Sequence, residues 1–134
     1  ELIETLIQKA RTYIFTTAMP AAVMAATRES LKIAQQETWR RDKLTSLVVR
    51  FRRGAEQLGL SLMPSETPIQ PVILGSNSAV LSASSYLKEK GILVGAIRHP
   101  TVRKSTERLR ITLSAIHSES QVDNLLLRLE EVIC

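Results

Sequence analysis

Apolar positions in the first third of the chain recur with the period of a helix. Over residues 1–11 they fall on one helix face, at Leu2, Ile3, Leu6, Ile7 and Ala10. Residues 12–19 (TYIFTTAM) are rich in β-branched and aromatic side chains, which predicts an extended segment or a short strand. Pro20 fits the first turn of a following helix that would run to about residue 36, with Thr17 as its candidate N-cap.

A longer helix is predicted for residues 38–58. Most of its arginines and lysines fall away from an apolar stripe that consists of Leu44, Leu47, Val48, Phe51, Ala55 and Leu58. Gly59 follows directly and is typical of a helix C-terminus. The charged run at residues 39–43 (WRRDK) is interpreted as a solvated helix face.

After Gly59 the pattern changes to short apolar runs typical of strands. Strands are predicted at residues 60–63, 69–75, 92–97 and 108–114. Pro71 indicates an edge position or a bulge for the second of these, because proline has no N–H to give to a neighbouring strand.

Two helices separate or follow these strands. The first covers residues 76–91, with an N-cap among Ser76, Asn77 and Ser78 and with Gly91 at its end. The second follows a capping box formed by Ser118 and Gln121, and its apolar stripe comprises Val122, Leu125, Leu126, Leu129 and Val132. The sum is an α/β (α+β) two-layer domain, a small sheet with packed helices, preceded by a connecting segment.

Composition narrows the function classes. The 134 residues are 44% hydrophobic and 23% charged, as in soluble globular proteins, and no apolar run approaches the roughly 20 residues that span a bilayer. The net charge of +5 comes with few aromatic residues, which does not favour a nucleic-acid-binding module. A single cysteine, Cys134, favours a reducing, cytoplasmic compartment, and two histidines do not predict a metal site. The chain starts at Glu1, inside a predicted helix, which suggests a piece of a longer protein.

One segment concentrates positive charge. Between residues 98 and 110 there is one acid, Glu107, among the cationic and titratable side chains of Arg98, His99, Arg103, Lys104, Arg108 and Arg110. Strand alternation places Arg110 on the face opposite Leu109 and Ile111, so that its guanidinium points away from the core. There it can grip a carboxylate with two parallel hydrogen bonds. The alternative is a surface arginine paired with an acid from a helix.

Three ordered blocks resemble the α-oxoamine synthase family. They are YIFTTAMP (13–20), IQPVILGSN (69–77) and AIRHPTVRKSTERLRITLSAIHS (96–118), and together they extend over most of the chain. The last block resembles the family's C-terminal signature, an "IR-P-TV" loop that leads into an "RLRITL" strand. Three positions depart from the family pattern: His99 and Arg103 stand where proline is usual, and Ser105 stands where glycine is usual.

The resemblance implies a homodimeric enzyme of the aspartate-aminotransferase fold (fold type I) that uses pyridoxal 5'-phosphate. Residues 1–19 would end the large cofactor-binding domain or connect it, and residues 20–134 would form the C-terminal small domain. The second and third blocks favour the branch that condenses L-alanine with a pimeloyl thioester, carried by coenzyme A or by acyl carrier protein, on the way to biotin. Glycine C-acetyltransferase and 5-aminolevulinate synthase are alternatives within the family, and a non-catalytic domain that binds anions or a protein partner is the alternative outside it.

The same resemblance assigns roles to residues. Arg110 would hold the alanine carboxylate, Thr17 or Thr16 would bind the cofactor phosphate of the partner subunit, and Thr101 would lie near the acyl chain. Arg98 would contact substrate or form a structural ion pair, of which the ion pair is preferred, and His117 is interpreted as a support for the turn into the last helix. No catalytic residue is assigned, because none of the six lysines lies in the glycine-rich context of the family's cofactor lysine. The chain alone is therefore expected to be inactive.

Overall fold

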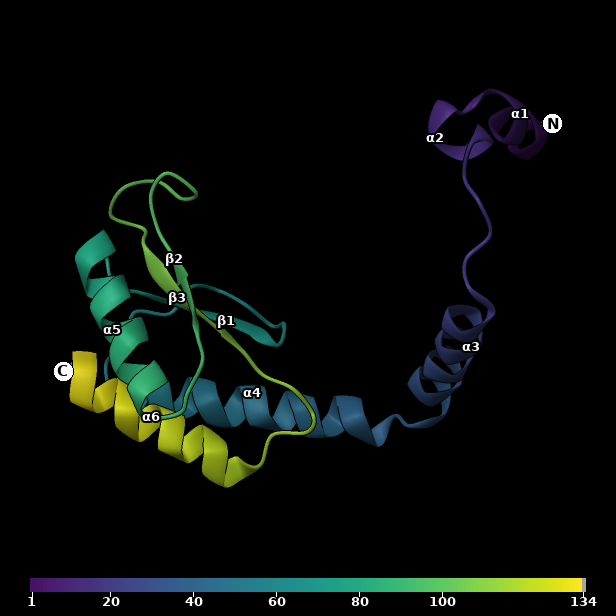
Figure 1. Ribbon diagram of the computed structural model, residues 1–134. Helices are drawn as coiled ribbons and strands as arrows, with labels where there is room; N and C mark the ends of the chain where they lie inside the picture. The colour runs from purple at the N-terminus through teal and green to yellow at the C-terminus, as the bar shows by residue number, and fades with distance from the viewer. Residues whose placement is uncertain (134) are drawn as a thin grey trace. The chain divides into compact units, whose positions relative to one another are not determined.

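The structure is a computed structural model that describes residues 1–133, so Cys134 and the expectation attached to its thiol lie outside the described residues. The chain divides into two compact units, residues 1–38 and residues 39–134 (Figure 1). Each is described by itself. The predicted division at residues 19 and 20 concerns the domains of a whole enzyme and stays a prediction.

The regular elements of the first unit are all helices. It contains α1 (Leu2–Lys9), α2 (Arg11–Ile14) and α3 (Ala21–Gln36). The helix expected over residues 1–11 is therefore confirmed, with a break at Ala10, whose backbone is extended. The extended segment expected at residues 12–19 is wrong at its start, because α2 continues the helical conformation to Ile14.

The cap expected for α3 is also wrong. The N-cap is Pro20, and no side chain provides a cap hydrogen bond, so Thr17 lies outside the helix and does not cap it. A backbone carbonyl accounts for the start instead: Pro20 O accepts from the amides of Val23 and Met24, at 3.0 and 3.2 Å. None of the three helices of this unit has a buried side chain.

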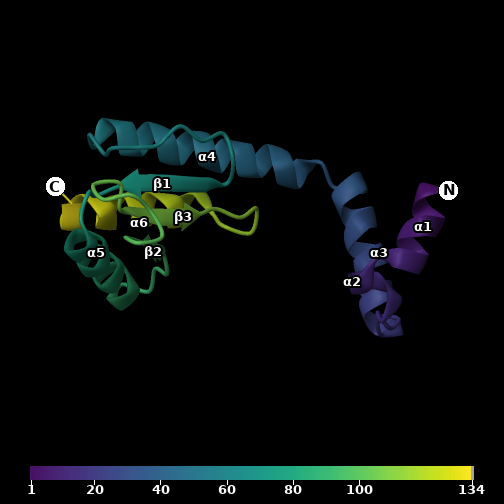
Figure 2. The ribbon, with the colours of Figure 1, turned by 90° about the horizontal axis from the view of Figure 1, so that it is seen from above.

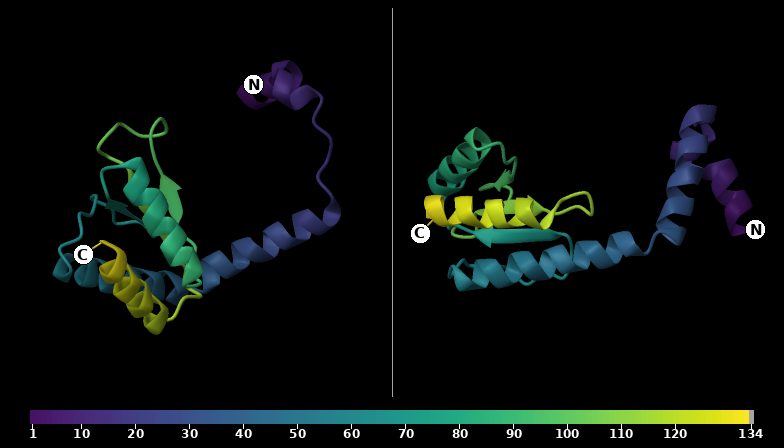
Figure 3. Two further views of the ribbon diagram at one scale, coloured as in Figure 1. Left: turned by 60° about the vertical axis from the view of Figure 1, so that its left-hand side comes forward. Right: turned by 90° about the horizontal axis from the view of Figure 1, so that it is seen from below.

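The second unit is a three-stranded sheet with three helices. Its elements are α4 (Trp39–Gln57), β1 (Ile69–Ile73), α5 (Asn77–Glu89), β2 (Gly95–Ile97), β3 (Arg108–Thr112) and α6 (Glu119–Ile133). The strand order is β1-β3-β2, and both pairings are antiparallel. Within this unit α4 and α6 run alongside each other next to the sheet, and α5 packs beside β2 (Figures 2 and 3).

The five elements predicted from residue 69 onward and the helix predicted at 38–58 are confirmed in type, with shorter strands than expected. The strand expected at residues 60–63 reduces to one bridge, between Leu62 and Val72. Pro71 explains why: its carbonyl accepts from the Met63 amide at 3.2 Å, but it has no N–H to return the bond. Pro71 therefore lies on an edge strand, as its sequence context indicates.

The predicted helix ends at Ser76, Gly91 and Ser118 are confirmed by cap hydrogen bonds and backbone conformation. The Ser76 hydroxyl accepts from the Ala79 amide at 3.2 Å, and Gly91 adopts a positive φ of 79° after α5. The capping box before α6 is reciprocal, because the Ser118 amide donates to Gln121 Oε1 at 2.8 Å and the Gln121 amide donates to Ser118 Oγ at 3.2 Å.

The core of the second unit lies between the three helices and one face of the sheet. Its buried side chains come from every element of the unit except β2 and include Phe51, Leu87, Leu109, Ile111 and Leu129. One fully buried polar residue, Gln70, belongs to the same face. Its amide nitrogen donates to the carbonyls of Thr67 and Ser65, at 2.6 and 3.2 Å, and its carbonyl accepts from Arg52 at 2.8 Å. Burial of this amide is thus compensated by three hydrogen bonds.

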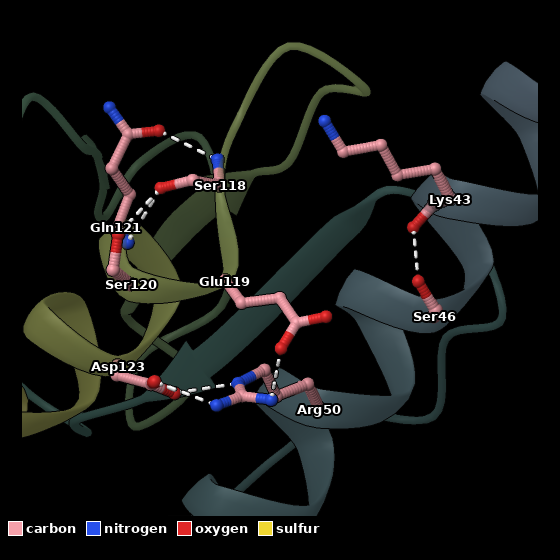
Figure 4. A network of polar contacts seen from close by, with 8 residues as sticks. All are labelled: Lys43, Ser46, Arg50, Ser118, Glu119, Ser120, Gln121 and Asp123. Atoms are coloured by element: carbon pink, nitrogen blue, oxygen red, sulfur yellow. Dashed lines mark hydrogen bonds and ion pairs between the residues drawn. The ribbon is translucent and has the colours of Figure 1, made fainter.

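An ion-pair network joins α4 to α6 at the surface (Figure 4). Arg50 donates two hydrogen bonds to the Asp123 carboxylate and one to Glu119, each of 2.7 Å. The hydrogen bonds from Arg50 lower the pKa of Asp123 and raise that of Arg50 itself. Close by, Gly54 permits the approach of the two helices, since a Cβ there would lie 2.3 Å from Leu126 Cδ1.

Candidate functional site: the open face of the sheet

One face of the sheet carries no helix and is the candidate site. Burial alternates along β1 and β3, so that residues between the core positions point to the other side. Directly paired residues of antiparallel strands share a face. The register therefore collects eight residues on what is here called the open face: Ile69, Pro71, Ile73, Gly95, Ile97, Arg108, Arg110 and Thr112.

Arg110 lies on the central strand, between Pro71 of β1 and Gly95 of β2. Its side chain is exposed, as the alternation predicts, while Leu109 and Ile111 on either side of it are buried. Its stem lies over Gly95, where an added Cβ would be 3.5 Å from both Arg110 Cβ and Arg110 Nε. The compact ring of Pro71 on one side and the absence of a side chain at Gly95 on the other leave the Arg110 guanidinium accessible.

Arg110 has no counter-ion among the residues that the structure describes. Over residues 1–133 no hydrogen bond or ion pair engages its side chain, and the open face carries no Asp or Glu. The alternative of an arginine neutralised by a helix acid describes Arg50, which pairs with two acids of α6, and not Arg110. A guanidinium that is fixed on a strand and free of an internal partner can bind a carboxylate from outside with two hydrogen bonds.

The rest of the open face is apolar apart from Arg108 and Thr112. Three isoleucines, Ile69, Ile73 and Ile97, flank the central strand. Arg108 is half-buried; its Nη1 contacts the sulfur of Met63, and its Nε is buried without a hydrogen-bond partner. The arrangement is suited to a ligand that combines a carboxylate with an aliphatic portion.

The loop at residues 98–107 joins β2 to β3 at one end of the open face. Its backbone is held by the amide of His99, which donates to Asn77 Oδ1 at 3.1 Å, and by two turns, from Arg98 to Val102 and from Arg103 to Thr106. Thr101 is exposed in the first of these turns. Arg98 is exposed as well and has no ion-pair partner in the described part of the chain, so the structural pairing expected for it is absent there.

Ser105 has a φ of 63°, the left-handed conformation that glycine adopts at little cost. It is the one described non-glycine residue with a positive φ. The sequence marks this position as a departure from a family glycine, and the backbone retains the conformation that a glycine would favour.

The two candidate phosphate ligands differ in their hydrogen bonds. Thr16 Oγ1 donates to the Thr12 carbonyl at 2.7 Å, which closes the end of α2. The exposed hydroxyl of Thr17 has no hydrogen-bond partner among the described residues and does not cap α3. Of the pair, Thr17 is therefore the one with a free donor for an external phosphate.

His117 supports the turn into α6, as expected. Its Nδ1 accepts from the Ser114 amide at 3.1 Å, and the His117 amide donates to the Ser114 carbonyl at 3.0 Å. Nδ1 is thus an acceptor in this geometry, which leaves the proton of the neutral ring on Nε2.

Gly95 is the residue of the open face that the sequence did not single out. Its contribution depends on the register that sets it opposite Arg110, and register is a contact between segments fifteen residues apart. A glycine inside a predicted strand is the one available signal, since such glycines often mark a close approach of another group. Within residues 1–133 no group of acids, histidines or cysteines could hold a metal ion, and no helix is long and apolar enough to cross a bilayer.

Comparisons with known proteins agree on one family. Residues 1–129 match the family model described as aminotransferase class I and II. The 8-amino-7-oxononanoate synthases of Pseudomonas paraeruginosa and Nitrosococcus oceani are 56% and 58% identical over 131 and 132 residues; each alignment covers 98% of this chain but 33% and 35% of the relative. The chain thus spans about a third of the length of these relatives.

Solved structures show the same relation. Serine palmitoyltransferase of Sphingomonas wittichii aligns with a TM-score of 0.90 at 27% identity, over 97% of this chain and 33% of that enzyme. 8-Amino-7-oxononanoate synthase of Francisella tularensis aligns with a TM-score of 0.84, also at 27% identity, over 97% and 38%.

Proposed function

The chain belongs to the class I and II aminotransferase family, and from this premise we propose that it is the C-terminal third of an enzyme that condenses L-alanine with a pimeloyl thioester and releases CO₂. Its fold, a small antiparallel sheet with packed helices, is that of the small domain of fold-type-I enzymes, as the resemblance implied. The observation that carries the proposal is Arg110, exposed on the open face without an internal counter-ion.

In this proposal Arg110 binds the carboxylate of L-alanine. Two parallel N–H···O bonds fix both the position and the rotation of the carboxylate, so the substituents of the adjacent Cα are oriented as well. Pyridoxal 5'-phosphate, when bound, supplies the electron sink for the bond that breaks at that carbon. The contribution of this chain is geometry, because it presents the anchor on a rigid strand whose neighbours at Pro71 and Gly95 leave it accessible.

The other assignments are part of the same proposal. Thr17 donates its free hydroxyl to the cofactor phosphate, preferred over Thr16, whose hydroxyl is already bonded. Thr101, exposed in the loop at residues 98–107, contacts the acyl chain. The whole enzyme works as a homodimer in the cytoplasm, and the unburied apolar side chains of residues 1–38 support cover by parts of that assembly.

The cofactor lysine is proposed to lie outside this chain. All six lysines are described and none is buried; Lys32 is paired with Glu29 at 3.0 Å, and Lys104 projects from the hairpin loop. None stands on the open face with Arg110. The chain mixed with pyridoxal 5'-phosphate is therefore expected to develop no visible absorbance band of a lysine adduct. A borohydride-reducible adduct at one defined lysine would contradict this part of the proposal.

The test of activity uses a chimera in which this chain replaces the corresponding third of the Pseudomonas paraeruginosa relative, to which it is 56% identical. The chimera is expected to release CO₂ from L-alanine with a pimeloyl thioester, faster than from glycine with acetyl or succinyl thioesters. Faster turnover of glycine than of L-alanine would instead assign the chain to a glycine-using branch, glycine C-acetyltransferase or 5-aminolevulinate synthase. No turnover by a folded chimera with any of these pairs would refute the proposal.

A further inference from the structure

A group of cations in the loop between β2 and β3 has no partner in the described part of the chain. The cationic loop is defined as residues 98–104, with Arg98, His99, Arg103 and Lys104, all four of them exposed. Within residues 1–133 no hydrogen bond or ion pair engages any of these side chains. Two other arginines of the same unit do have acidic partners: Arg50 pairs with Glu119 and Asp123, and Arg128 pairs with Glu131 at 2.7 Å.

The one acid of the segment does not neutralise these charges. Glu107 is only 4% exposed, and its Oε2 is buried without a hydrogen-bond partner, so the carboxylate is turned into the protein and away from the loop surface. The loop is also preorganised, because its two turns and the bond from the His99 amide to Asn77 fix the backbone that carries the cations. The result is a concentrated positive surface on an ordered loop.

The position of the loop links it to the proposed site. It connects β2 to β3, and Arg110 lies two residues along β3 from Arg108 at the loop end of the strand, about 7 Å at the rise of a β-strand. In the proposed reaction the acyl carbon must meet the Cα of the alanine that Arg110 holds, so the carrier portion of the thioester extends over the surface around the open face, which includes this loop. The two carriers of acyl thioesters, coenzyme A and acyl carrier protein, hold the thiol on an arm that ends in phosphate. In coenzyme A the phosphate is part of a nucleotide, and in the carrier protein it is a phosphodiester on the protein.

We propose that Arg103 and Lys104 bind a phosphate group of the carrier portion of the acyl thioester. The proposal rests on the proposed function and deepens it. The guanidinium of Arg103 can donate two hydrogen bonds to phosphate oxygens, and the ammonium of Lys104 adds a point charge beside it. Arg103 also stands where the family usually has proline. Relatives with proline at this position would lack the contact that is proposed for Arg103.

The test compares two double variants of the chimera that remove the same charge. Arg103→Gln with Lys104→Gln alters the cationic loop, and Arg53→Gln with Lys88→Gln removes two exposed cations from α4 and α5. Three pimeloyl thioesters serve as probes: those of coenzyme A, of acyl carrier protein and of N-acetylcysteamine, the last of which has no phosphate. The readout is kcat/KM for each thioester, at low and at high salt.

The loop variant is expected to lower kcat/KM at low salt about fivefold or more for one phosphate-bearing thioester, with a smaller loss at high salt. The N-acetylcysteamine thioester and the control variant are expected to show no such loss. Whichever of coenzyme A and carrier protein gives the larger effect identifies the source of the phosphate. An equal loss in both variants, or an equal loss with N-acetylcysteamine, would overturn the proposal.

Binding of free coenzyme A and of the carrier protein, measured by calorimetry on the same proteins, makes the test independent of turnover. The loop variant is expected to bind at least one of them about fivefold more weakly than the control variant does. Affinities that do not differ would overturn the inference even for a chimera without activity. An unmodified chimera that binds a carrier through this loop but converts no thioester would refute the proposed reaction and leave the loop assignment standing.

Discussion

Residues 1–38 and residues 39–134 are both rich in regular structure, yet only the second unit has a core. The three helices of the first unit bury no side chain, whereas Phe51, Leu87, Leu109 and Leu129 of the second are completely buried. The apolar periodicity that predicts a helix is nevertheless clear in both, as at Leu2, Ile3, Leu6 and Ile7. Apolar periodicity therefore predicts which face of a helix is suited to burial, but it does not predict that other residues of the same chain bury that face.

The largest expected effect uses the two phenylalanines of the chain, one in each unit. Phe51 is 0% exposed and Phe15 is 84% exposed. Phe51→Ala is expected to lower the free energy of unfolding by about 3–5 kcal/mol, because it leaves a cavity in the core. Phe15→Ala, the matched control, is expected to change it by less than about 0.5 kcal/mol. Denaturant unfolding followed by circular dichroism measures both, and similar losses at the two sites would contradict the division into a packed and an unpacked unit.

A smaller effect is expected from the polar member of the core. Gln70→Leu leaves the carbonyls of Ser65 and Thr67 without the amide that donates to them, and is expected to cost about 2–3 kcal/mol. Gln57→Leu makes the same chemical change at an exposed position of α4 and is the control. If Gln70→Leu were neutral in the same unfolding experiment, the hydrogen bonds of this amide would not support the loop between α4 and β1.

Ser105→Gly is expected to stabilise the second unit by up to about 1 kcal/mol, because glycine removes the cost of a left-handed φ at a small cost in chain entropy. Ser105→Ala deletes the hydroxyl but keeps the Cβ, and is expected to give no gain. Thermal unfolding of the three proteins measures the difference. A gain with alanine equal to that with glycine would show that backbone conformation is not the cause.

The smallest expected effect concerns acid stability. Because Arg50 holds the pKa of Asp123 below its ordinary value of 3.8, the ion pair stabilises the fold above about that pH, and the contribution is lost as the pH falls through the folded-state pKa. Arg50→Gln is therefore expected to lower stability near neutral pH and to resemble the unchanged chain at strongly acidic pH. Unfolding free energies measured between pH 7 and pH 2 test this, and a difference that does not shrink toward low pH would contradict it.

Local signals predicted most of the second unit. The caps at Ser76 and Ser118, the glycine at position 91 and the edge position of Pro71 each depend on neighbours in sequence or on the chemistry of one residue. The outward direction of Arg110 follows in the same way from strand alternation.

The predictions that failed have one local cause and two causes that depend on pairing between distant segments. Thr12, Tyr13 and Ile14 are β-branched or aromatic, yet they lie in α2, because the helical turn outweighs a weak strand preference. The strand expected at residues 60–63 is reduced to the bridge between Leu62 and Val72, because Pro71, opposite Met63, has no N–H to donate; the sequence alone does not show this pairing. The role of Gly95 beside Arg110 is missed for the same reason, since it exists only in the register of β2 with β3.

Arg110 is proposed to bind the carboxylate of L-alanine, and the kinetics of the chimera with Arg110→Lys show whether it does. Lysine keeps the positive charge but loses the two parallel hydrogen bonds, so KM for L-alanine is expected to rise by on the order of 10- to 100-fold while KM for the pimeloyl thioester stays within about twofold. Arg108→Lys, on the same strand and face, is expected to leave KM for L-alanine within about threefold of its starting value. An unchanged KM for L-alanine in Arg110→Lys, or an equal rise in both variants, would contradict the account.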